Sequence, residues 1–111
     1  MSIDPTEAIV VFMTAADGAE AQRLAELLIE KRLAACVQIL PEIQSVYRWQ
    51  GRVERQPEVL LLLKTTRAKF EELEREVRAV HSYETPEIVA VPITAGSVPY
   101  LQWLAGSLEE N

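Results

Sequence analysis

The 111-residue sequence predicts an α+β fold in which two helices back a single antiparallel sheet. Two short apolar stretches, 8–15 and 88–93, have the length and the β-branched content of buried strands. Between them, an alternating segment that starts at Val37 leads to a tight-turn signal at Gln50 and Gly51, which predicts a hairpin. Segments with helical spacing follow the first strand and the hairpin, as an α+β fold requires.

The first helix is expected at about 17–32. Asp17 followed by Glu20 has the spacing of a capping box, in which side chains satisfy backbone N–H groups at the helix start. The apolar residues that follow recur at helical spacing. They are Ala21, Leu24, Ala25 and Leu28. One face of this helix is therefore expected to pack on the sheet.

The hairpin is expected to be long, with a buried base and an exposed tip. Pro41 lies within its first strand and, because proline has no N–H group, it predicts a bulge or an edge position. Gly51 supplies the positive φ that a two-residue turn needs. The return strand is polar as far as Pro57 and then becomes the apolar run 59–63. One small domain cannot cover a polar and aromatic tip of this length, which favours a partner surface.

The second half of the chain is expected to contain a helix, a strand and one added helix. Thr66 is placed to cap the first of these helices and Ser97 the last. Their apolar faces are expected at Phe70, Leu73, Val77 and Val80, and at Leu101, Leu104 and Leu108. The whole order matches a ferredoxin-like βαββαβ sandwich with a long hairpin between its second and third strands and an added C-terminal helix. In that topology the first and third strands are central, and one domain spans 1–111.

Composition and charge disfavour several classes of partner. Eleven Lys and Arg against seventeen Asp and Glu give a formal charge of −6, whereas nucleic-acid binding needs a basic surface. The longest uninterrupted apolar run, 59–63, is far shorter than the roughly 20 residues of a membrane span. No basic and apolar leader opens the sequence, so we expect a soluble, cytoplasmic protein. The one cysteine, Cys36, excludes a disulfide within the chain and any two-cysteine metal motif, and its apolar neighbours predict burial.

No segment has the pattern of a catalytic centre. A nucleophile needs a base within hydrogen-bond reach, and the only histidine, His81, has no Ser or Cys triad near it in the sequence. A pairing of Cys36 with His81 is the one arrangement left open. The four glycines are isolated, so the sequence has no phosphate-binding loop. We therefore expect a protein that is not an enzyme.

A group of aromatic and charged residues is the candidate ligand site. Its members are Tyr47, Trp49, Glu58, Lys64, Tyr83 and Glu87. A Trp beside a turn is often half-exposed in a monomer, which favours a partner interface or a ligand wall. Lys64 follows five apolar residues, and a desolvated ammonium group needs a carboxylate, with Glu58 and Glu87 as candidates. We predict a cleft at a subunit boundary lined by these residues; simple interface packing and a structural ion pair are the alternatives.

Five motifs in register resemble the CutA divalent-cation tolerance family over about 10–108. They are the segments 33–37, 45–54, 64–66, 81–88 and 100–104. The resemblance implies a homotrimer of ferredoxin-like subunits whose long hairpins join sheets across subunits. It also implies an association with tolerance to divalent cations, copper above all.

The resemblance places metal ligands at positions that match Met13, Val80 and His81. Only His81 is a good ligand, so any copper or zinc site is expected to be weak and to involve His81, with Glu84 assisting. The alternative function is a regulatory trimer similar to the P-II signalling proteins, which binds a small metabolite or a partner protein. An acylphosphatase-like enzyme is disfavoured because no phosphate cradle follows the first strand.

Overall fold

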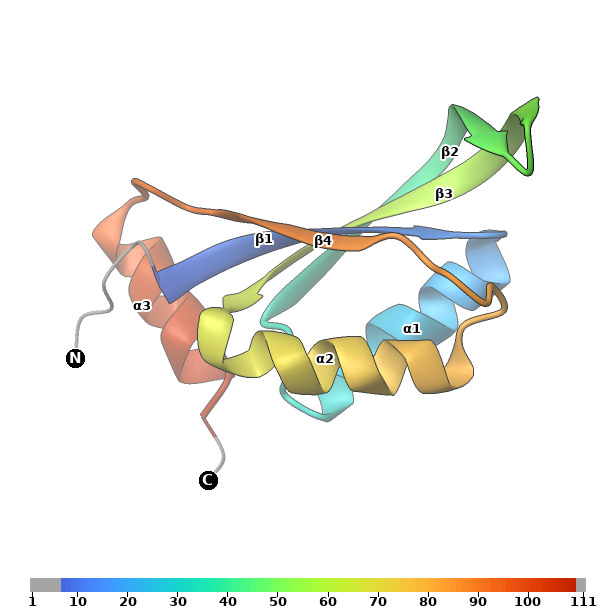
Figure 1. The fold of residues 1–111 in the computed structure, drawn as a ribbon. Coiled ribbons are helices and arrows are strands. Elements are labelled where there is room, and N and C mark those ends of the chain that lie inside the picture. The colour runs from blue at the N-terminus through green and yellow to red at the C-terminus, as the bar shows by residue number, and fades with distance from the viewer. Residues whose placement is uncertain (1–6, 110–111) are drawn as a thin grey trace.

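The computed structural model describes residues 7–109, which form one antiparallel four-stranded sheet with its helices (Figure 1). In chain order the elements are β1 (Ala8–Ala15), α1 (Gly18–Glu30), β2 (Cys36–Trp49), β3 (Arg52–Thr66), α2 (Arg67–Val80), β4 (Ile88–Pro92) and α3 (Val98–Ser107). The strand order β2-β3-β1-β4 makes β1 and β3 central, as predicted. The ferredoxin-like prediction is therefore confirmed. The start of the chain, where we expected no leader, lies outside the described residues.

Helices α1 and α2 cover one face of the sheet, and no described helix lies on the other face (Figure 1). The core lies between the sheet and these two helices, because alternate residues of β1 and β3 point toward the helices and are buried. Helix α3 packs at one end of the sheet, where Leu101, Leu104 and Leu108 bury Ala8. None of the helices within 7–109 has both the length and the apolar composition that crossing a membrane requires.

Helix α1 begins as its sequence predicts. The Asp17 carboxylate accepts a hydrogen bond from the N–H group of Glu20 at 2.9 Å. The helix ends at Glu30, two residues before the predicted end, because Arg32 adopts a left-handed conformation with φ of 55°. The guanidinium of Arg32 then donates to the carbonyl oxygen of Ser107 at 3.0 Å, which ties this turn to the end of α3.

The starts of α2 and α3 differ from the prediction in detail. Thr66 and Ser97 occupy the capping positions, but neither side chain makes a capping hydrogen bond. Val80 was expected on the buried face of α2, and it is exposed. The reason is that the helix ends at Val80 and the extended residue His81 turns its side chain into the interior instead.

The hairpin of β2 and β3 extends past the rest of the sheet (Figure 1). Its register shifts between Leu40 and Ile43, next to Pro41, and β2 is an edge strand, so both expectations for this proline are confirmed. The turn has φ of 50° at Gln50 and 79° at Gly51, which is the backbone that the twist of a two-residue hairpin favours. Strand β3 starts immediately after the turn at Arg52, well before the apolar run that identified it.

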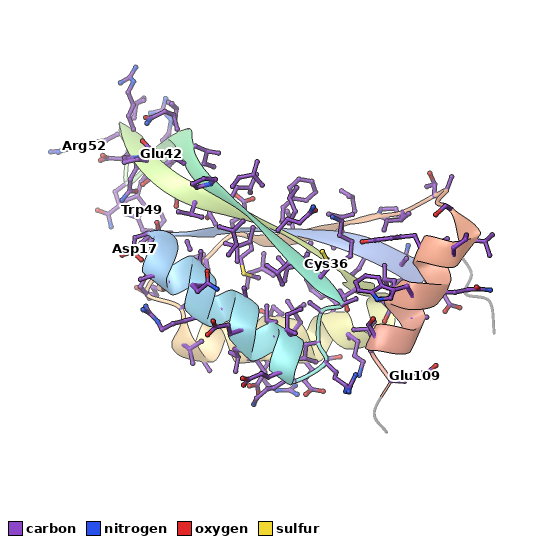
Figure 2. The ribbon with its side chains drawn as sticks, turned by 180° about the vertical axis from the view of Figure 1, so that it is seen from behind. Asp17, Cys36, Glu42, Trp49, Arg52 and Glu109 are labelled. Atoms are coloured by element: carbon purple, nitrogen blue, oxygen red, sulfur yellow. The ribbon has the colours of Figure 1, made fainter. Side chains whose placement is uncertain are left out.

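Cys36 is half-buried rather than a core residue. Val37 and Ile39 pack against the core under the helices, so the alternating residue Cys36 points toward the uncovered face of the sheet. Figure 2 shows it at the base of the hairpin, far from Glu42 and Arg52 at the protruding end. His81 is joined to Thr14, Tyr83 and Glu20 and makes no hydrogen bond to Cys36, so the Cys–His pairing is not formed in residues 7–109.

Candidate ligand-binding cleft

A cleft of about 560 Å³ lies between the outer half of the hairpin and the segment that connects α2 to β4. Its lining combines aromatic, hydroxyl and carboxyl side chains: Thr14, Ser45, Val46, Tyr47, Trp49, Gln56, Glu58, Tyr83, Glu84, Thr85 and Glu87. Five of the six residues predicted for the ligand site are therefore brought together. Figure 2 shows Trp49 at the same end of the molecule as Asp17, where α1 begins.

Glu58 and Tyr83 form the floor of this cleft. Glu58 is only 8% exposed, and the Tyr83 hydroxyl donates to its Oε2 at 2.7 Å. Burial raises the pKa of Tyr83, and the hydrogen bond to Glu58 and its negative charge raise it further. Tyr83 therefore stays protonated and acts as a donor throughout the physiological pH range.

The aromatic wall comes from β2. The hydroxyl of Tyr47 donates to Oε1 of Gln56 on β3 at 2.6 Å, which fixes the ring across the two strands. Trp49 lies two residues further along the same side of β2 and is 53% exposed. Both rings thus have apolar surface that no part of residues 7–109 covers.

A buried carboxylate that the sequence analysis read only as a helix-capping residue supports the cleft from below. Glu20 accepts hydrogen bonds from the N–H group of Ala16 at 3.0 Å and from the N–H and hydroxyl groups of Ser82 at 2.7 and 2.9 Å. Burial by itself would raise the pKa of Glu20, but these hydrogen bonds hold it below its ordinary value. The contacts join the start of α1 to the segment that carries Tyr83.

A signal for this role was present in the sequence. Glu20 precedes Leu24 and Leu28 at intervals of four, which places its carboxylate on the buried face of α1. The role of Ser82 could not be predicted in this way. Ser82 lies in an irregular segment, and its hydrogen-bond partner, Glu20, is 62 residues away in the sequence.

His81 does not have the geometry of a metal ligand. Its side chain is fully buried, and Nδ1 accepts a hydrogen bond from the N–H group of Tyr83 at 3.0 Å. Nε2 therefore carries the proton and donates to the carbonyl oxygen of Thr14 at 2.8 Å. Both nitrogens are therefore engaged in hydrogen bonds within the described residues, and neither offers a free lone pair to a metal ion.

The other positions expected near a metal do not replace it. Met13 is fully buried in the core, Val80 has no donor atom, and Glu84 belongs to no group of three ligating side chains among the described residues. Within 7–109, no three His, Cys, Asp or Glu side chains are grouped closely enough to hold an ion. The described residues of one chain thus do not fit a resident copper or zinc ion.

Lys64 lies outside the cleft, and this prediction needs correction. Its ammonium group donates to Oε1 of Gln38 on β2 and not to the carboxylate of Glu58 or Glu87. Glu58 and Lys64 share one face of β3, but six residues of strand separate them by about 20 Å. Lys64 is a half-buried residue on the uncovered sheet face, and its exposed ammonium group is paired with a side-chain amide.

Comparisons with known proteins find similar sequences along most of the chain. The model of the family described as CutA1 divalent ion tolerance protein matches residues 9–107. A divalent-cation tolerance protein CutA from Thermus thermophilus is 50% identical over 95 residues, which are 86% of this chain and 92% of that protein. The chloroplastic protein CutA of Arabidopsis thaliana is 44% identical over 99 residues, which are 89% of this chain. The chain spans only 54% of the length of that plant relative.

Solved structures give the same result. CutA1 from Oryza sativa superposes with a TM-score of 0.91 at 40% identity, over 98% of this chain and 100% of that chain. A protein from Archaeoglobus fulgidus described as a periplasmic divalent cation tolerance protein CutA superposes with a TM-score of 0.89 at 41% identity. That match covers 92% of this chain and 99% of that one.

Proposed function

The chain belongs to the CutA1 divalent ion tolerance protein family, and from that premise we propose that it acts as a homotrimer in the response to divalent cations, copper above all. The cleft of each subunit, completed at a subunit boundary, is the proposed ligand site. The observation that carries the proposal is the half-exposed Trp49, which lies on a protruding hairpin and forms one wall of a formed cleft. Trp49 thus belongs both to the exposed surface that a neighbouring subunit is proposed to cover and to the proposed ligand site.

The apolar surface of a single chain supports assembly. Val46 and Val53 near the hairpin tip are 61% and 54% exposed, and Val89 and Val91 of β4 lie on the uncovered sheet face. Exposed apolar surface on a folded chain favours an interaction site. Closed cyclic symmetry lets each hairpin cover the same region of a neighbouring subunit, so that all copies are satisfied equally.

We expect the purified protein to be a trimer. Because the exposed surface includes both the hairpin and the open sheet face, association should persist at micromolar concentration. Multi-angle light scattering coupled to size-exclusion chromatography measures this mass directly, with a monomer mass of 12.5 kDa as the reference. A monomer throughout the micromolar range would contradict the proposal.

The proposed response to copper does not require a metal ion held tightly at His81. We expect calorimetric titration with Cu²⁺ or Zn²⁺, kept soluble by a weak competing ligand, to show weak binding only. His81→Ala should leave that affinity unchanged, because the imidazole nitrogens are already bonded to Thr14 and Tyr83. The control is Cys36→Ser, which removes the one thiol. Binding that is present in the wild type and disappears in His81→Ala, with the fold intact by circular dichroism, would contradict this expectation and support the weak metal site predicted at His81.

Two further parts of the proposal concern the type of function and the location in the cell. We propose a binding protein and not an enzyme, since the one imidazole is committed to structural hydrogen bonds beneath the cleft. The runner-up is a regulatory trimer similar to the P-II signalling proteins, favoured by the position of the cleft beside a protruding hairpin. A cytoplasmic location is proposed from the composition, although relatives carry the descriptions chloroplastic and periplasmic.

A further inference from the structure

We infer that the cleft binds a small organic ammonium ion, which donates N–H hydrogen bonds to Glu58 while its carbon chain lies against Trp49 and Tyr47. The inference names the ligand class of the cleft, and it rests on the ligand-binding role proposed above.

Glu58 is a buried carboxylate without a positive partner. The residue as a whole is more than nine-tenths buried, and within 7–109 the only hydrogen bond of its side chain is the one that Tyr83 donates to Oε2. Every side-chain oxygen of the described residues that is closed to solvent has a hydrogen-bond partner. Oε1 of Glu58 has no such partner, so it must be open to the cleft that Glu58 lines. A buried charge is costly unless it is paired, and the cleft beside Glu58 has room for a cation that would pair with its carboxylate.

The rest of the cleft also favours a cation. Glu84 and Glu87 are exposed at its rim, and none of its lining residues is a Lys, an Arg or a His. Three carboxylates with no opposing positive charge give a negative potential that attracts cations and repels anions. A carboxylate or phosphate ligand is therefore disfavoured.

The walls distinguish an organic cation from a metal ion. A metal ion needs several converging donor atoms, and the described residues hold no group of three such side chains. The faces of Trp49 and Tyr47 instead attract organic cations and cover carbon surface. The volume of about 560 Å³ lies within the range of sites for small organic ligands.

The hydrogen-bonding pattern further selects an ammonium group that carries N–H. Oε2 of Glu58 and Oε1 of Gln56 already accept bonds from Tyr83 and Tyr47, whereas Oε1 of Glu58 can only accept. A primary ammonium satisfies that oxygen. A quaternary ammonium has no N–H to donate and would leave Oε1 without a hydrogen bond.

The test is calorimetric titration of the assembled full chain with n-butylammonium, tetramethylammonium, butyrate and magnesium chloride at matched ionic strength. We expect n-butylammonium to bind more tightly than each of the other three. Glu58→Gln should weaken its binding at least tenfold, since the amide still accepts from Tyr83 but the charge is gone. Glu42→Gln is the matched control, because it removes the same charge from the same hairpin outside the cleft lining, and it should change the affinity less than twofold.

The possible results separate the two proposals. Binding of butyrate or magnesium in place of n-butylammonium, lost in Glu58→Gln, would retain the ligand-binding cleft but overturn the ammonium assignment. Equal binding of n-butylammonium to wild type and Glu58→Gln would overturn it as well. If none of the four probes binds, the ammonium inference fails, whereas the proposed trimer is tested separately by light scattering. Should Glu58→Gln fail to fold, Glu58→Asp keeps the charge, and its shorter reach should still weaken n-butylammonium binding.

Discussion

Trp49→Ala should dissociate the trimer at concentrations where the wild type stays assembled. The indole is 53% exposed in one chain, so about 100 Å² of aromatic surface remains for a neighbouring subunit to bury. At about 25 cal/mol per Å², that burial is worth about 2.5 kcal/mol per subunit. Interface anchors of this type lose about 2 kcal/mol or more on truncation to alanine. Three equivalent sites therefore lower the assembly constant by a factor of at least about 10⁴.

The measurement is sedimentation equilibrium or light scattering over a dilution series, together with a melting curve at fixed protein concentration. Trp49→Phe is the matched control, because it keeps an aromatic ring at the same position on β2 and should retain most of the assembly. If Trp49→Ala leaves both the mass and the melting temperature unchanged, the indole is a free surface feature and the subunit boundary lies elsewhere.

Glu20→Gln should destabilise the fold by about 2–3 kcal/mol at neutral pH. Three donors converge on the two oxygens of this carboxylate, namely the N–H groups of Ala16 and Ser82 and the Ser82 hydroxyl. An amide offers one oxygen and two N–H groups, so at least one backbone donor loses its acceptor in a buried position. The expected consequence is a looser 82–87 segment as well as a lower free energy of unfolding.

The loss should depend on pH in a defined direction. The pKa of Glu20 in the folded chain is lower than its ordinary value of 4.5, so the unfolded chain binds more protons between these two values. The stabilisation is fully present above about pH 4.5 and is lost as the pH falls through the lower, folded-state pKa. The stability difference between wild type and Glu20→Gln should therefore be constant near neutrality and should shrink in acid.

Urea unfolding at neutral and acidic pH, at one protein concentration, measures this difference. Glu26→Gln is the control, because it removes the same charge from the exposed side of the same helix, and it should change stability by no more than about 0.5 kcal/mol. A difference of the same size at every pH would show that the Glu20 charge contributes nothing, and that the shape of the side chain alone matters.

Much of this architecture was determined by local sequence. The left-handed backbone that Gln50 and Gly51 allow closes the hairpin in one register, and Pro41 places the irregularity in β2 where an N–H group is missing. Continuous apolar composition put β1 and β3 at the centre of the sheet. These features depend on residues within one turn or one strand of each other, so the sequence carries them directly. The aromatic positions Tyr47 and Trp49 followed from the same hairpin pattern.

The tertiary structure alone decided how the charged and polar groups are satisfied. Lys64 and Glu58 belong to one strand, but the rise of a strand puts them at different ends of it, and Gln38 became the partner of Lys64. Glu20 is hydrogen-bonded to Ser82, and His81 to Thr14, although more than 60 residues of chain separate the members of each pair. A hydrogen bond needs its atoms placed within a few tenths of an ångström. Periodicity along the sequence predicts only which face of a helix or strand a side chain lies on. The hydrogen-bond partners were therefore determined by how β1, α1 and the 81–87 segment pack together.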